Sequence, residues 1–164
     1  MKINYLTSDL KSYYLEDFQR LLTYDDSEFW DIDSGIQDIL ININTNQNVQ
    51  TLYSKRYIPK KGNFDLECLS YLQLAYMPQA ENSILVLLTN LSNDSNLTGA
   101  EMFFVADKPS GNPNYRSDDT SGLGCRNNPD YFKVMHFYIS LNSDDTDHHD
   151  FFWKKLGFGL STIK

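Results

Sequence analysis

The sequence predicts an α+β fold, with a single, mainly antiparallel sheet of about five to six strands. N-terminal helices and a short C-terminal helix are expected to pack on that sheet. Apolar residues near the N-terminus recur at helical spacing, and the middle of the chain holds short apolar or alternating runs bounded by proline and glycine. The length of 164 residues is typical of one domain, so residues 1–164 are expected to form a single domain.

The N-terminal segment predicts a short strand followed by the clearest helix of the chain. Residues 2–6 fit the strand. The helix is predicted by apolar residues spaced three and four apart, which form one stripe: Leu10, Tyr13, Tyr14, Phe18, Leu21 and Leu22. Thr7 or Ser8 can cap its start, and Asp9 falls in the first turn, where the helix dipole favours negative charge.

A second helix is expected to open at Asp33 or Ser34. Ser34 followed three residues later by Gln37 has the form of a capping box. Four apolar residues then share one helical face: Ile36, Ile39, Leu40 and Ile43. Alternate residues of the same segment are also apolar, so a strand is the competing interpretation, and we favour the helix.

The middle of the chain indicates β structure. Residues 49–58 fit a strand closed by Pro59, and residues 64–68 alternate between apolar and acidic side chains. The continuation of this second strand is ambiguous and ends at Pro78. The continuous apolar run over 83–89 is interpreted as a central strand.

The C-terminal half is expected to complete the sheet and close with a helix. Residues 100–106 are predicted to pair antiparallel with 83–89, after a polar loop around Asn93. Residues 107–130, rich in glycine and proline, indicate a long loop, and 133–141 a further strand. A short helix over about 146–156 is expected to end with Gly157 as its C-terminal cap.

Composition favours some partners and disfavours others. The formal net charge is −8 and the pI is near 4.7, which disfavours direct binding to nucleic acids or anionic membranes and would attract a basic protein. The alternative is that acidity only maintains solubility. No secretory signal is visible, and Cys68 and Cys125 lie far apart, so we expect a cytoplasmic protein with reduced thiols.

Two acidic clusters are the candidate partner-binding sites. The first interleaves carboxylates with two aromatic side chains: Asp25, Asp26, Glu28, Phe29, Trp30, Asp31 and Asp33. Aromatic anchors surrounded by charge are typical of protein interfaces. The alternative is that the aromatic pair folds inward while the acids remain solvated.

The second cluster precedes the C-terminal segment and comprises Asp144, Asp145, Asp147, His148 and Asp150. A divalent metal is one interpretation, but adjacent helical residues point about 100° apart and cannot all converge on one ion. Acidic residues also favour a helix N-terminus for electrostatic reasons. We therefore assign this cluster to partner binding and assign no metal.

Catalytic motifs find little support in the sequence. There is no Gly-x-Ser-x-Gly elbow, no P-loop and no dinucleotide-binding fingerprint, and neither cysteine has an activating local context. His136 alternates with apolar neighbours, as a sheet residue does. No catalytic residue and no cofactor is assigned.

The octapeptide Phe-Phe-Trp-Lys-Lys-Leu-Gly-Phe over residues 151–158 resembles the last motif of the GCN5-related N-acetyltransferases, and residues 2–22 look like the opening of that fold. The resemblance implies a shared fold without the chemistry. The nearest match to the family's acetyl-CoA loop places Asp119 where the pyrophosphate would sit. The family's general-acid tyrosine falls on Trp153, which has no titratable group.

In size, acidity and aromatic-rich acidic clusters, the chain resembles the immunity proteins of interbacterial toxin systems, including contact-dependent growth inhibition. That resemblance implies an inhibitor that binds and neutralises a cognate basic toxin domain, such as a nuclease. The alternatives are a degenerate acetyltransferase-like protein, a metal-dependent enzyme, and an antirestriction protein that mimics DNA. The acidic residues are clustered rather than periodic, so the DNA mimic ranks lower.

Overall fold

The computed structural model describes residues 3–23, 34–59, 68–93, 99–106, 131–141 and 145–164. The elements in chain order are β1 (Ile3–Asn4), α1 (Ser8–Leu22), α2 (Gln37–Thr45), β2 (Val49–Lys55), β3 (Cys68–Tyr76), the 3-10 turn η1 (Pro78–Ala80), α3 (Glu81–Asn93), β4 (Gly99–Ala106), β5 (Tyr131–Leu141) and α4 (Thr146–Ser161). They form one mainly antiparallel sheet with helices packed on it, which confirms the predicted α+β class.

Strands β3 and β5 form the centre of the sheet, and β2 lies at one edge. β3 pairs antiparallel with both β2 and β5, and β4 pairs antiparallel with β5. β1 runs parallel to β5 for two residues, with Ile3 opposite Tyr131. The expected count of five to six strands is not confirmed, because β1 is only two residues long and one of the expected strands is a helix.

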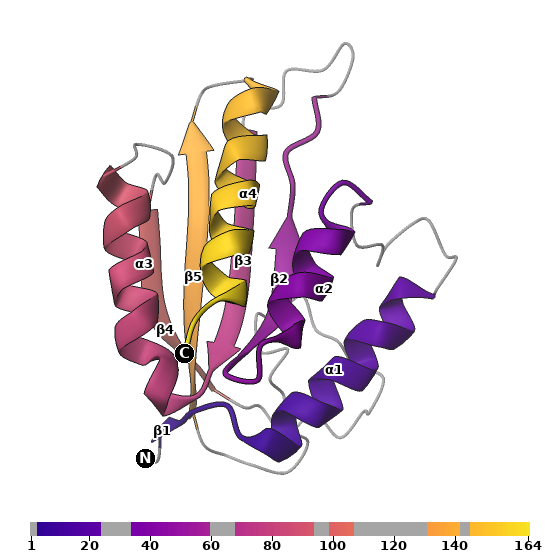
Figure 1. The fold of residues 1–164 in the computed structure, drawn as a ribbon, viewed down its shortest axis with the longest axis vertical. Coiled ribbons are helices and arrows are strands. Elements are labelled where there is room, and N and C mark those ends of the chain that lie inside the picture. The colour runs from indigo at the N-terminus through magenta and orange to yellow at the C-terminus, as the bar shows by residue number, and fades with distance from the viewer. Residues whose placement is uncertain (1–2, 24–33, 60–67, 94–98, 107–130, 142–144) are drawn as a thin grey trace.

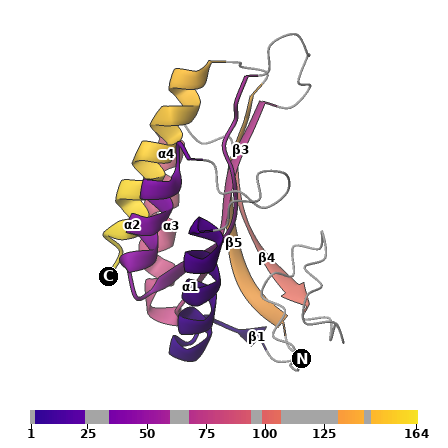
Figure 2. The same cartoon turned by 90° about the vertical axis from the view of Figure 1, so that its right-hand side faces the viewer.

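Helices α2, α3 and α4 cover one face of the sheet, with α4 between the other two (Figures 1 and 2). The register places Leu74 opposite Met135 and Leu72 opposite Phe137, so both strands direct apolar side chains toward the helices. The main core joins the two layers and includes Leu40, Ile43, Leu72, Leu74, Ile84, Met135, Phe137, Phe152, Trp153, Leu156 and Leu160.

The expected central strand over 83–89 is wrong, because these residues lie within helix α3. Ile84 and Leu91 are buried, whereas Leu85 and Val86 are 40% and 61% exposed. Apolar side chains spaced by seven residues on one face are typical of a helix, and the apolar run spreads around it. As a consequence β4 pairs with β5 and not with residues 83–89, and Asn93 ends the helix instead of lying in a loop.

Of the N-terminal caps predicted for the first two helices, one is confirmed and one is wrong. Thr7 caps α1, because its Oγ1 accepts a hydrogen bond from the backbone N–H of Leu10 at 3.3 Å. The second helix is confirmed over the competing strand, but it begins at Gln37, and its N-cap Ile36 makes no side-chain capping bond. The capping box expected at Ser34 therefore does not form, and Asp33 lies outside the described residues.

Two glycines lie inside α4 and not after it. The helix continues to Ser161, so the assignment of Gly157 as a terminal cap is wrong. A Cβ atom on Gly157 would lie 2.5 Å from Ile39 Cγ2 of α2, and one on Gly159 would collide with Leu87 Cδ1 of α3. Both glycines are therefore explained by the close approach of the neighbouring helices.

The remaining strand predictions are largely confirmed. β2 covers most of the predicted 49–58, and β5 includes all of the predicted 133–141. The ambiguous continuation before Pro78 is strand β3. The predicted strand residues 64–67 and the predicted loop 107–130 lie outside the described residues.

We predict that Gly157→Ala destabilises the protein by about 1–3 kcal/mol, because the new methyl group collides with a β-branched side chain that is stiff in a helix. In an open helix interior, the same change would stabilise by about 1 kcal/mol. Urea denaturation measures the difference. In an Ile39→Ala background the collision is absent, so Gly157→Ala should no longer destabilise; an unchanged penalty there would contradict the explanation.

Candidate functional site

The structure describes only part of the predicted partner-binding set. Asp25, Asp26, Glu28, Phe29, Trp30, Asp31, Asp33 and Asp144 lie outside the described residues. The remaining four residues, Asp145, Asp147, His148 and Asp150, lie together at the start of α4.

These four residues have different local roles. Asp145 caps α4, since its Oδ1 accepts a hydrogen bond from the Asp147 backbone N–H at 3.0 Å. Asp150 forms an ion pair with Arg56 on the segment after β2, at 3.0 Å between Oδ1 and Nη2. Asp147 is exposed in the first turn, and His148 is partly buried. Asp147 and Asp150 therefore both face solvent without capping α4, and Asp150 does so while paired with Arg56.

Neither a metal centre nor a membrane span is found among the described residues. Within those ranges, no three His, Cys, Asp or Glu side chains are grouped so that they could hold a metal ion. None of the described helices is both long enough and apolar enough to cross a membrane.

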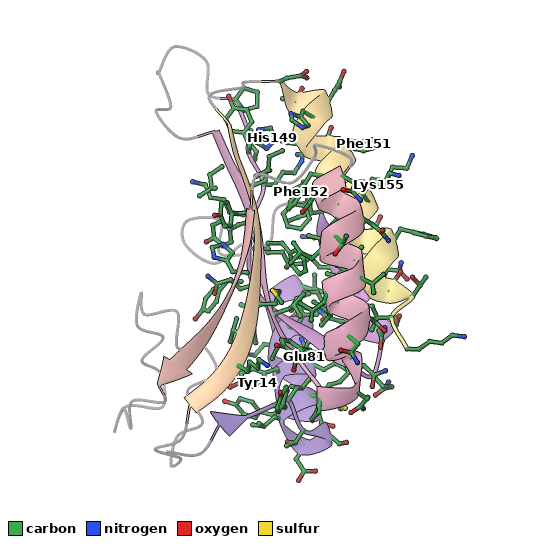
Figure 3. All side chains as sticks on the ribbon, turned by 90° about the vertical axis from the view of Figure 1, so that its left-hand side faces the viewer. Tyr14, Glu81, His149, Phe151, Phe152 and Lys155 are labelled. Carbon is green, nitrogen blue, oxygen red and sulfur yellow. The ribbon has the colours of Figure 1, made fainter. Side chains whose placement is uncertain are left out.

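His149 points inward from α4 and links the helix to the sheet (Figure 3). Its Nδ1 lies 2.8 Å from Ser70 Oγ of β3, and that oxygen also accepts a hydrogen bond from the Tyr57 backbone N–H at 2.9 Å. The tautomer of the ring decides whether the ring nitrogen or the serine oxygen donates the hydrogen bond between them. Both side chains are almost fully buried, so this serine–histidine pair cannot reach a substrate and serves the fold.

The sequence carries a signal for this inward histidine. His149 falls on the same helical stripe as the buried residues Trp153, Leu156 and Leu160, at spacings of three and four. The predicted partner-binding cluster omits His149, and it is assigned no role among the sequence-based predictions.

A second polar cluster joins the segment just after β1 to α3 and β5. Lys133 Nζ forms an ion pair with Glu81 and donates to Tyr5 Oη at 3.2 Å, while Tyr5 Oη donates to the other Glu81 oxygen at 2.8 Å. The hydrogen bond from Lys133 lowers the pKa of Glu81. Burial alone would lower the pKa of Lys133, but its bonds to Glu81 and Tyr5 outweigh burial and raise it. The cluster therefore favours the charged forms of Lys133 and Glu81 and keeps them paired.

Lys11 is a buried lysine that joins α1 to the end of α2 and the start of β2. Its Nζ donates to the carbonyl oxygens of Val49 at 2.7 Å and Asn44 at 3.1 Å, and to Gln50 Oε1 at 3.4 Å. These three acceptors are uncharged, so burial dominates and lowers the pKa of Lys11 to about 8. The ammonium group is buried, and its hydrogen bonds hold α1 against α2 and β2.

The outward face of α4 presents a different kind of surface, which we call the α4 stripe: Asp147, Phe151, Lys154 and Phe158. Phe151 is 40% exposed and Phe158 is 72% exposed. Figure 3 shows Phe151 and Lys155 directed away from the sheet, while Phe152 points toward it. Lys155 Nζ lies 5.2 Å from the centre of the Phe151 ring, which is within cation–π range. Within the acetyltransferase-like octapeptide, Trp153 and Leu156 are buried.

The acidity of the chain is unevenly distributed. The described segments contain nine acidic and eight basic residues, so nearly all of the net charge of −8 belongs to the sequence outside them. The α4 stripe carries charges of both signs, with Asp147 near its start and Lys154 near its middle. The α4 stripe combines aromatic and charged groups on one helix; the face of α1 with Asp9 and Tyr13 does so too, but Tyr13 is 45% exposed against 72% for Phe158.

The chain matches no protein-family model, no curated protein and no solved structure. Its function is therefore argued from its own residues.

We predict that Ser70→Ala destabilises the protein by about 2–3 kcal/mol, because it removes a buried partner from both the Tyr57 N–H and the His149 ring. Ser12→Ala is the matched control, since the Ser12 hydroxyl bonds to the Ser8 carbonyl on the exposed side of α1. Thermal and urea unfolding of the two variants should differ clearly; equal, small effects would contradict a structural role for the serine–histidine pair.

We predict that the contribution of Lys11 to stability increases with pH. The pKa of this lysine is lowered from 10.5 to about 8 in the folded protein, so the unfolded chain holds the proton more tightly between these values. Raising the pH through that window removes a folded-state penalty on the order of 3 kcal/mol. The difference in unfolding free energy between the wild type and Lys11→Met should therefore rise from pH 8 to 10.5. A difference that falls over that range would contradict the prediction.

Proposed function

We propose that this chain is a protein-binding inhibitor that neutralises a cognate basic toxin domain, and that the α4 stripe forms part of its binding surface. The single observation that carries the proposal is the exposure of Phe158, at 72%, two turns along the helix from Phe151. A phenylalanine this exposed contributes little to its own fold. A partner that buried its ring would gain about 1.5–3 kcal/mol.

The chemistry of the stripe fits an anchor surrounded by charge. Asp147 lies one turn before Phe151, and Lys154 lies one turn before Phe158, so each aromatic ring has a charged neighbour on the same face. Such charges fix the register of a partner more than they add affinity. The net charge of −8 acts at longer range and would speed the approach of a basic domain.

The buried polar groups also favour binding over catalysis in the part of the chain that the structure describes. Ser70 and His149 bond to each other in the interior, and Lys11 is enclosed by carbonyl oxygens. Serine, histidine and lysine side chains can act as nucleophiles, acids or bases when they reach a substrate. Here each one instead joins two secondary-structure elements through a buried hydrogen bond. An inhibitor needs a stable scaffold and an exposed anchor, and these contacts supply the scaffold.

We predict that Phe158→Ser weakens binding to a cognate toxin domain, identified by its co-purification with the full chain, about 10- to 100-fold, mainly through faster dissociation. The toxin domain is produced with an inactivating substitution, and biolayer interferometry measures both rate constants. Ile58→Ser is the control, because Ile58 is 55% exposed and lies outside the α4 stripe, in the segment whose Arg56 pairs with Asp150 at the opposite end of α4 from Phe158. Both variants should keep the melting temperature of the wild type.

A parallel assay measures growth of cells that express the active toxin together with each variant. The wild type and Ile58→Ser should protect, and Phe158→Ser should protect less. If the wild type neither binds the toxin domain nor protects the cells, the proposed function is wrong. If Phe158→Ser binds as tightly as the wild type, the α4 stripe is not part of the surface.

A further inference from the structure

The solvent face of α3 differs from that of the other helices. Seven of its residues are exposed and none carries a charge: Asn82, Leu85, Val86, Thr89, Asn90, Ser92 and Asn93. The exposed faces of α1, α2 and α4 include Glu16, Asp38 and Lys154, respectively. Depletion of charge is the compositional feature of the central part of protein interfaces. In a chain with 22% charged residues, a helix face of this size without charge is an interface candidate.

The polar groups of this face can pair with copies of themselves. An asparagine amide both donates and accepts hydrogen bonds, whereas an ammonium group only donates and a carboxylate only accepts. The hydroxyls of Thr89 and Ser92 already donate to the carbonyls of Leu85 and Leu88, at 3.0 and 2.9 Å. These two hydroxyls would keep their hydrogen bonds in an interface, so the free-energy cost of removing them from water is small.

The apolar residues lie near the middle of the face. Val86 is 61% exposed and Leu85 is 40% exposed. Asn82, Val86, Thr89 and Asn93 are spaced four, three and four apart, so they form one line along the helix. α3 is at the edge of the helix layer, with α4 on one side of it and no described helix on the other (Figure 1). The line is therefore open to a second helix.

We infer that α3 pairs with α3 of a second copy of this chain, antiparallel across a two-fold axis, with Leu85 and Val86 at the centre. A two-fold interface places the same patch on both partners, so a face with charges of one sign would repel itself. The α3 face avoids this repulsion although each copy carries a net charge of −8. A basic toxin domain would instead gain from acidic contacts, which this face does not offer. The inference is independent of the proposed function.

Sedimentation equilibrium of the full chain over a range of concentrations tests the pairing. The wild type should form dimers, and Val86→Glu should raise the dissociation constant at least about tenfold, because two glutamates then meet near the axis. Ile58→Glu adds the same charge at a similarly exposed site outside α3 and should leave the constant nearly unchanged. Melting temperatures of both variants establish that neither has unfolded.

Salt dependence provides an independent readout. The dimer should tighten as ionic strength rises, because salt screens repulsion between the two acidic chains while the contact itself holds no ion pairs. A dimer that weakens with salt would place the contact on charged surfaces and overturn the inference. So would a wild type that stays monomeric at about 1 mM, which is far above the dissociation constant of a specific dimer, or a Val86→Glu variant that dimerises as well as Ile58→Glu.

Discussion

The placement of α4 between α2 and α3 is the constraint on which the rest of the structure depends. The helix can approach both neighbours only because Gly157 and Gly159 carry no side chain at the points of contact. Its last turn is held by Asn46, whose Nδ2 donates to the carbonyls of Leu160 at 3.0 Å and Ile163 at 2.8 Å. At its other end, His149 bonds to Ser70 of β3. These contacts set the position and the rotation of one helix over the sheet.

The rotation of α4 decides which of its residues a partner can reach. With His149 and Trp153 directed into the core, Phe151 and Phe158 necessarily face solvent, because they lie on the opposite side of the helix. Two separate surfaces result from the same helix layer. The α4 stripe combines aromatic rings with charges, which suits a charged partner, whereas the α3 face has no charge, which suits a copy of itself.

Local patterns predicted several elements well and one badly. The stripe from Leu10 to Leu22 and the cap at Thr7 depend on contacts within one helix, so the sequence contains the necessary information. The run over 83–89 was interpreted as a strand, although a short apolar segment satisfies a buried strand and a packed helix equally well. The choice depends on whether it lies over the sheet or within it, and that is a long-range property.

The sequence alone determined the α+β class, the N-terminal helix, the strands β2 and β5, and the acidity of the chain. It also placed Asp145, Asp147, His148 and Asp150 together at one helix start, because neighbours in sequence are neighbours in a helix turn. Only the tertiary structure decided that His149 is buried and Phe158 exposed, that Gly157 serves helix packing, and that β4 pairs with β5. Each of these depends on which distant element lies opposite, and no local pattern specifies that partner.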